Sequence, residues 1–230
     1  MTNTASTLSP GDDGIAGRTS VIGNYSSARD ATLRIDIGGI VAATAFQETG
    51  GRHDRLAVTG NANLSGSLRL SLCDGFVPAP ADTFTIVSAN TINGTFDNAN
   101  PWGLFTTLDG HSAFALQATA TTLVLRDFTQ LGDVGLDGSI GNEDIAPFVA
   151  LLTGGNASGR LGFAADVNGD GAVNNRDIAP FVALLTGGRP IGRIADDPDF
   201  APLLTLVPEP GAMTLLAFLT SAALRRRLRT

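Results

Sequence analysis

The sequence has one cysteine, two histidines, one tryptophan and no lysine, so all 15 of its basic residues are arginine. A lone cysteine excludes a disulfide framework and a cysteine-based zinc site, and we expect Cys73 to be a small side chain buried in a β-strand. His53 and His111 stand in turn-like sequence without spaced partners, which predicts solvated loop residues. Because the sequence also lacks a Ser-His-Asp order, a phosphate loop and an HExxH helix, we expect a protein that is not an enzyme.

The formal net charge is -7, although four arginines crowd into the last six positions. Nucleic-acid binding needs Lys or Arg clustered on one face, so an acidic body without a basic stripe argues against a nucleic-acid partner. An acidic chain of this kind is better suited to binding calcium. Paired carboxylates such as Asp12-Asp13 and Asp196-Asp197 lie in loop-like sequence, where we expect them to be solvated.

The amino terminus offers little structural signal. Residues 1–16 have neither a basic region nor an apolar core, so they do not form a secretory signal peptide. We expect residues 1–30 to be poorly ordered. If the protein is exported, its start is either misplaced or belongs to a fragment of a longer chain.

Residues 31–127 show apolar side chains at every second position, most clearly at Leu64, Leu68, Leu70 and Leu72. This alternation predicts half-buried β-strands, and dipeptides such as Asp74-Gly75 predict the tight turns between them. The expected fold is therefore mainly β, either a β-solenoid or a β-sandwich, which the alternation alone does not distinguish. The stretch from Leu56 to Phe96 resembles the β-solenoid segments of bacterial surface proteins of the autotransporter-passenger kind.

A duplicated motif follows, with its copies 33 residues apart, beginning at Asp133 and Asp166. The first copy reads DVGLDGSIGNEDIAPFVALLTGG and the second DVNGDGAVNNRDIAPFVALLTGG, and their last twelve residues are identical. The repeat delimits a small α-helical domain that we expect over residues 128–190.

The second copy has the oxygen spacing of a twelve-residue calcium (Ca²⁺) loop, in which alternate side chains, one carbonyl and a late carboxylate surround a hard cation. Gly171, at position 6, permits the sharp turn that such a loop needs. Position 12 is Asp in both copies instead of the usual Glu. The expected ligands are Asp166, Asn168, Asp170, the Ala172 carbonyl, Asn174 and Asp177.

The first copy departs from this pattern because Gly135 at position 3 has no side-chain oxygen. We expect this site to bind calcium more weakly than the second, or to use a water in place of the missing ligand. Its expected ligands are Asp133, Asp137, the Ser139 carbonyl and Asp144.

A helix should follow each loop, since Ile178, Phe181, Val182 and Leu185 form an apolar stripe that ends at Gly187. Two units of this kind, each a loop and then a helix with no helical pattern before it, resemble the type I dockerin family. The resemblance implies two calcium loop–helix units packed with pseudo-twofold symmetry, and a cohesin-like docking partner. Neither short helix is expected to be stable alone in water.

The positions before each final loop Asp are Asn142-Glu143 and Asn175-Arg176, where dockerins of cellulose-degrading complexes usually carry a Ser-Thr type pair. Different residues at the docking face imply a different partner, or none. The family is often appended to glycoside hydrolases, so the resemblance also implies an association with polysaccharide breakdown.

After an extended linker expected over residues 191–206, Val207-Pro208-Glu209-Pro210 precedes an apolar stretch and an arginine cluster. This order, over residues 207–230, resembles the PEP-CTERM sorting signal of Gram-negative bacteria. The resemblance implies a C-terminal apolar helix held transiently in the inner membrane with its arginines cytoplasmic, and a sorting peptidase that releases the body to the cell surface.

The leading hypothesis is a non-enzymatic, calcium-binding protein of the cell surface or the extracellular space, whose dockerin-like module serves stabilisation or docking. The alternative is a carbohydrate-active or carbohydrate-binding protein, although one Trp and one Tyr are few for sugar stacking. A calcium sensor is disfavoured, because weak extracellular sites mainly serve stability.

Overall fold

The computed structural model describes residues 1–48 and 50–187, all of which belong to one unit of the chain, Met1–Gly192. The predicted linker, the predicted sorting signal and the last residues of the predicted 128–190 domain lie outside the described residues. Within those residues, none of the helices combines the length and apolar character that a membrane crossing requires.

The described chain is mainly β, and its helices follow the last strand. The early strands are β1 (Thr2–Asn3), β2 (Thr7–Leu8), β3 (Arg18–Val21), β4 (Tyr25–Ser27), β5 (Thr32–Ile37), β6 (Val41–Ala42), β7 (Arg52–His53) and β8 (Arg55–Val58). The later strands are β9 (Asn61–Leu64), β10 (Ser67–Leu72), β11 (Phe84–Ser88), β12 (Thr91–Gly94), β13 (Phe105–Thr106), β14 (Ser112–Ala118) and β15 (Thr122–Gln130). The α-helices are α1 (Ile145–Leu152), α2 (Gly159–Ala165) and α3 (Ile178–Leu185), with 3-10 turns η1 (Asn142–Asp144) before α1 and η2 (Asn175–Asp177) before α3.

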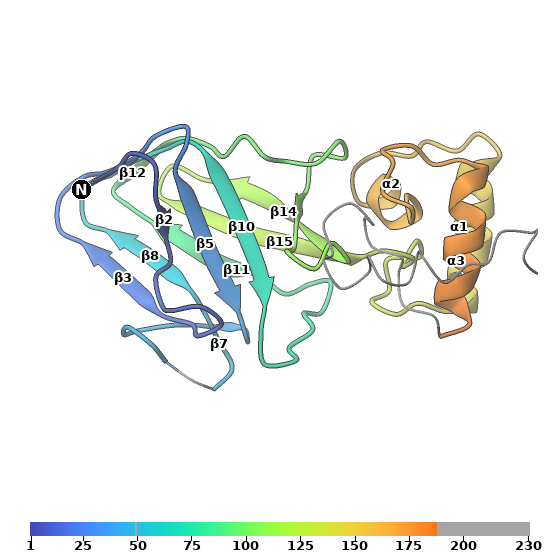
Figure 1. Ribbon diagram of the computed structural model, residues 1–230, viewed down its shortest axis with the longest axis horizontal. Helices are drawn as coiled ribbons and strands as arrows, with labels where there is room; N and C mark the ends of the chain where they lie inside the picture. Colours follow the sequence, from blue (N-terminus) through green and yellow to red (C-terminus); the bar gives the residue numbers. More distant parts are fainter. Residues whose placement is uncertain (49, 188–230) are drawn as a thin grey trace, which may run out of the picture. The chain divides into compact units, whose positions relative to one another are not determined.

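The strands form three sheets in which successive passes of the chain pair in parallel. One sheet has the order β1-β4-β9-β12, a second contains β2, β5 and β10, and a third contains β3, β8 and β11. Figure 1 shows β5 and β10 side by side with β2 next to β5. The chain thus visits the three sheets in the same order on consecutive passes, from β3 to β4 to β5 and again from β8 to β9 to β10.

Parallel register places like side chains above one another. Leu33 pairs with Leu68 and Ile35 with Leu70, and all four are buried in the main core. On the outer side, the amide of Asn63 donates to the Ser26 hydroxyl 37 residues earlier in the chain. The alternation read from the sequence therefore assigns the inward face correctly, because period two places every second residue on one side of a strand.

Glycine is required at two positions where the chain leaves a strand. Gly66, which follows β9, has a φ of 85°, and a Cβ there would lie 2.2 Å from the Ala31 carbonyl oxygen of the neighbouring pass. Gly94, at the end of β12, has a φ of 77°, and a Cβ there would lie 2.2 Å from the Leu64 carbonyl oxygen. Only glycine combines positive φ with such a close backbone approach.

The third sheet is extended by an antiparallel group, in which β11 pairs with β15, β15 with β14 and β14 with β13. Phe84, Phe114 and Phe128 pack here ring against ring, with centroid separations of 5.7 and 5.0 Å. Strand β15 leads directly into the first calcium loop, so this group joins the β-rich part to the helical part.

The expectation of a poorly ordered stretch over residues 1–30 differs from the structure, in which β1 to β4 occupy it. These strands are only two to four residues long, too short to show an alternating pattern in the sequence. They are fixed by parallel pairing with later passes, for example Val21 with Val58. The order of this region is therefore set by distant residues.

His53 is likewise not a solvated loop residue, since it lies in β7 and is buried. Its Nδ1 lies 3.1 Å from the Gly39 carbonyl oxygen and its ring packs edge-on to Phe84, while burial lowers its pKa. Cys73 is half-buried just after β10 instead of fully buried within a strand, and desolvation raises the pKa of its thiol to about 11.

Two fully buried carboxylates, Asp36 and Asp54, bind the early passes together. Asp54 accepts hydrogen bonds from the backbone N–H groups of Gly17 at 2.6 Å and Asp36 at 2.9 Å. Asp36 accepts from the Gly14 N–H, and its other oxygen faces the Arg34 guanidinium. Desolvation, opposed by these N–H groups and reinforced by the charge of Asp36, raises the pKa of Asp54 to about 7.

This pKa predicts that the contribution of Asp54 to the stability of the folded chain falls as pH rises toward neutrality. An aspartate whose pKa is about 3.8 when unfolded and about 7 when folded holds its proton longer in the folded state. Its contribution is complete below about pH 4 and falls by about 1.4 kcal/mol per pH unit up to about pH 7. In urea unfolding between pH 5 and 7 with saturating calcium, Asp54→Asn should show a smaller decline than the wild type. Equal declines in the two proteins would refute this assignment.

Candidate calcium centre

Two loops hold the oxygen-bearing residues identified in the sequence, and each leads into a 3-10 turn and then a helix. Loop 1, residues 133–144, follows β15 and ends in η1 and α1, whereas loop 2, residues 166–177, follows α2 and ends in η2 and α3. The sequence analysis found no helical pattern before either loop, so α2 is an element that it missed. Glycines at positions 159 and 162 interrupt its apolar pattern, and burial of Phe163, Ala164 and Ala165 stabilises it.

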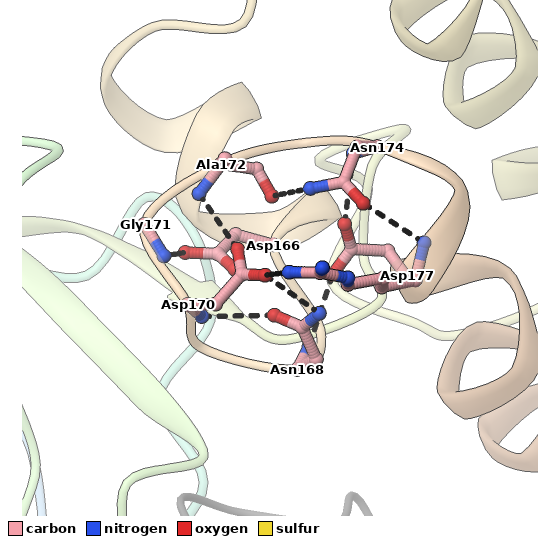
Figure 2. Close-up of polar contacts among 8 residues, drawn as sticks. Asp166, Asn168, Asp170, Gly171, Ala172, Asn174 and Asp177 are labelled. Carbon is pink, nitrogen blue, oxygen red and sulfur yellow. Dashed lines mark hydrogen bonds and ion pairs between the residues drawn. The ribbon is translucent and has the colours of Figure 1, made fainter.

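Loop 2 is closed by its first and last residues, Asp166 and Asp177, both of which are buried. Figure 2 shows their carboxylates inside the turn of the loop, with the other labelled side chains around them. One oxygen of Asp177 accepts from the Asn168 N–H at 3.1 Å and the other from the Asn174 N–H at 2.9 Å. Asp166 Oδ2 accepts from the Gly171 N–H at 3.0 Å.

Three further side chains of loop 2 hold the backbone in tight turns, because each accepts a hydrogen bond from the N–H group two residues later in the chain. Asn168 Oδ1 accepts from the Asp170 N–H, and Asp170 Oδ1 accepts from the Ala172 N–H. Asn174 repeats the arrangement with the Arg176 N–H at 2.9 Å. These Asx turns bring alternate side chains to one side of the loop, as convergence on a cation requires.

Loop 1 has the same closure despite its missing ligand at Gly135. Asp144 accepts from the N–H groups of Gly135 at 2.6 Å and Gly141 at 2.8 Å, as Asp177 does at the equivalent positions of loop 2. Asp133 accepts from Asp137 and Gly138, both at 3.1 Å. Because the backbone N–H of residue 135 still makes its bond, the glycine removes one side-chain oxygen and leaves the loop geometry in place.

In both loops, buried carboxylates of like charge lie close together, and burial together with this repulsion raises the pKa of two of them. Desolvation raises the pKa of Asp177, and the neighbouring charges of Asp166 and Asp170 add to the rise while two N–H groups oppose it. Desolvation also raises the pKa of Asp133, with Asp144 and Asp137 adding to it. A cation placed among these carboxylates would remove the repulsion that raises both values.

A second observation favours a cation at loop 2: Asp166 Oδ1 is buried and lacks any hydrogen-bond partner among the described residues. Leaving a buried carboxylate oxygen unpaired is costly, and a metal ion compensates that cost. Carboxylates alone do not form the site, since no three Asp, Glu, His or Cys side chains gather as a metal cluster within residues 1–48 and 50–187. The donors of loop 2 are mixed, with amide and carbonyl oxygens beside the carboxylates, which is the ligand chemistry of calcium.

The two helices that follow the loops pack through one face of each. Phe148 of α1 and Phe181 of α3 stack with centroids 4.0 Å apart and ring planes 17° apart. Val134, Ala164 and Val167 complete the same cluster from outside the two helices. Figure 1 shows α1 and α3 alongside one another.

Residues 131–181 match the family model of the dockerin type I domain. Type I dockerin domains bind calcium in their loop–helix units, so calcium is the cofactor of this module. The match covers both loops and the first half of α3, and it supports the dockerin-like prediction made from the repeat. No curated protein and no solved structure matches the chain significantly.

The apolar stripe predicted on α3 is not a single buried face. Phe181 and Leu184 are buried, whereas Ile178 and Val182 are 42% and 49% exposed. The helix is apolar on more than one side, so the spacing of its residues does not decide which of them face the core. The structure places the aromatic residue inward because it stacks on its counterpart in α1.

The sequence analysis also missed a contact between loop 2 and the β-rich part. The indole Nε1–H of Trp102 donates to Asp166 Oδ2 at 2.9 Å across 64 residues of sequence. No local pattern in the sequence reveals such a pair.

Calorimetric titration of the chain with calcium should resolve two binding events, because loop 1 keeps its closure but has Gly135 and Gly141 where loop 2 has Asn168 and Asn174, and so has two side-chain oxygens fewer. Asp166→Ala should abolish the tighter event and Asp133→Ala the weaker one. Absence of binding heat in the wild type, or a tighter event that survives in Asp166→Ala, would contradict the assignment of the loops.

Proposed function

We propose that the chain is a non-enzymatic, calcium-stabilised protein whose dockerin-like module docks a partner through the outer faces of α1 and α3. The observation that carries this proposal is a matched pair of exposed apolar side chains on each helix. Calcium binding would order the loops, the loops would fix the starts of the helices, and the helices would present the docking face.

The proposed docking face consists of Ile145 and Val149 on α1 and Ile178 and Val182 on α3, which are 42 to 49% exposed. The two helices have identical sequences, and their buried phenylalanines stack, so equivalent residues are turned outward on both. Four branched apolar side chains exposed on adjoining helices are unfavourable in water and typical of an interaction site.

A cohesin-type protein is the partner that we propose, since dockerins bind cohesins. The residues just before the helices differ between the two units, with an acidic Glu143 in one and a basic Arg176 in the other. Neither matches the Ser-Thr type pair noted above. We therefore propose a partner surface that is apolar at its centre and carries its own pattern of charge at the rim.

Association with polysaccharide breakdown is the second candidate, because dockerin domains usually occur in carbohydrate-active systems. Direct sugar binding by the β-rich part receives less support. Tyr25 is buried in the main core, and the ring of Trp102 packs against Gly162 of α2, so both side chains are engaged in packing. We propose that any such association acts through a docked partner.

We propose that the β-rich part is a β-solenoid and not a sandwich. Support comes from parallel pairing of each pass with the next in three sheets, and from side-chain bonds between passes. The Asn93 amide donates to Asn63, 30 residues away, and Asn63 donates in turn to Ser26. A sandwich would instead be built mainly from antiparallel neighbours.

The proposed domain order is a β-rich domain over residues 31–127, extended by β1 to β4, followed by the dockerin-like domain over 128–190, the linker and the sorting signal. Dockerin modules are typically extracellular or at the cell surface. Export, the sorting peptidase and transient inner-membrane anchoring through residues 207–230 remain proposals that rest on the PEP-CTERM resemblance.

Charged residues introduced on the docking face should greatly weaken partner binding and leave calcium binding unchanged. A panel of immobilised cohesin domains serves as the probe, with binding measured by surface plasmon resonance. Val149→Asp combined with Val182→Asp should reduce affinity at least about 100-fold, because both exposed side chains would become charged at the buried centre of the interface.

Val77→Asp is the matched control, since Val77 is 62% exposed in the β-rich part. This variant should bind as the wild type does. Unchanged binding by the double variant would refute the proposed face, and loss of binding in both variants would point to a different surface.

A further inference from the structure

Trp102 is positioned by a compact turn between β12 and β13. Asn100 Oδ1 accepts from the N–H groups of Trp102 and Leu104, both at 3.0 Å, and its amide donates to the Thr106 hydroxyl at 3.1 Å. The turn therefore fixes the backbone of Trp102 from within the β-rich part.

The ring of Trp102 lies directly against α2, the helix that delivers Asp166 to loop 2. A Cβ at Gly162 would lie 2.1 Å from the ring, so only glycine leaves room for the indole. The ring also contacts a small core formed by Leu104, Ala113, Leu131 and Phe163, residues drawn from both the β-rich part and the helical part. Gly162 accepts the Asp166 N–H at 3.0 Å, which ties this packing to the start of the loop.

The indole reaches the first ligand of the loop itself. Asp166 Oδ2 receives two hydrogen bonds, one from Trp102 Nε1 and one from the Gly171 N–H. These bonds fix the plane of the carboxylate and leave Oδ1 buried without a partner among the described residues. Both donors are neutral, so the negative charge of Asp166 persists and Oδ1 is the atom available to a cation.

Loop 1 is held differently, and it provides an internal comparison. Both oxygens of Asp133 accept from N–H groups of their own loop, at Asp137 and Gly138. The first ligand of loop 1 is thus oriented locally, whereas the first ligand of loop 2 is oriented in part by the β-rich part.

We propose that Trp102 is a positioning residue of the second calcium site, which couples calcium affinity there to packing of the β-rich part on α2. Fixing a ligand before the ion arrives lowers the ordering cost of binding. By linkage, calcium in loop 2 strengthens the packing of Trp102 by the same factor. The proposal rests on the calcium ligand set assigned above to loop 2.

The test measures calcium dissociation constants by calorimetry in two backgrounds of the full chain, Asp133→Ala, which isolates loop 2, and Asp166→Ala, which isolates loop 1. Trp102→Phe keeps an aromatic ring beside Gly162 and removes only the indole N–H. In the Asp133→Ala background it should weaken calcium binding about tenfold, the effect expected for loss of one hydrogen bond to a charged group. In the Asp166→Ala background, Trp102→Phe should leave the calcium dissociation constant unchanged.

Gly162→Ala displaces the ring without altering either hydrogen-bonding group. It should also weaken calcium binding at loop 2 and leave calcium binding at loop 1 unchanged. Unchanged affinity in the Asp133→Ala background, or equal weakening in both backgrounds, would overturn the proposal. Absence of any calcium binding in the Asp133→Ala chain that retains Trp102 would instead overturn the ligand assignment, and the proposal with it.

Intrinsic fluorescence provides a readout that does not depend on how the Trp102 variants fold. The chain has one tryptophan, so its emission reports Trp102 alone. Calcium should shift that emission in the Asp133→Ala chain and leave it unchanged in the Asp166→Ala chain. A spectrum insensitive to saturating calcium in the Asp133→Ala chain would contradict the coupling.

Discussion

The helical part depends on four buried carboxylates, Asp133, Asp144, Asp166 and Asp177, which lie in loops with further negative charge nearby. Backbone N–H groups compensate part of their burial, but they do not neutralise the charge. A calcium ion bound among them would do so, and it would hold together the two ends of each loop. Since α1 and α3 are eight residues long and not expected to be stable alone, their persistence follows from the loops and from the Phe148–Phe181 stack.

The buried carboxylates of the β-rich part are compensated by protein groups instead. Asp36 is partnered by the Arg34 guanidinium, and Asp54 by two backbone N–H groups with a pKa raised to about 7. These residues join successive passes of the chain, as the stacked apolar side chains of β5 and β10 do. Trp102 is one of the residues through which the two parts contact each other.

Features with a local cause could be predicted from the sequence. The loop spacing specifies the loops and their following helices, and the alternation specifies the inward face of β9 and β10. Features set by distant residues could not: β1 to β4 are too short to carry a pattern, α2 depends on burial, and Ile178 faces outward because Phe181 stacks on α1. The burial of His53 and the bond from Trp102 to Asp166 have the same origin, since their partners lie on other strands or helices.

Amide hydrogen exchange with and without calcium tests most directly the claim that calcium organises the helical part. The account predicts that calcium slows exchange together in both loops and in α1 and α3, most strongly at the N–H groups of Asn168 and Asn174 that Asp177 accepts. Strands β5 and β10 of the main core should exchange equally slowly in both conditions. Exchange in loop 2 and α3 that is indifferent to calcium would contradict the account.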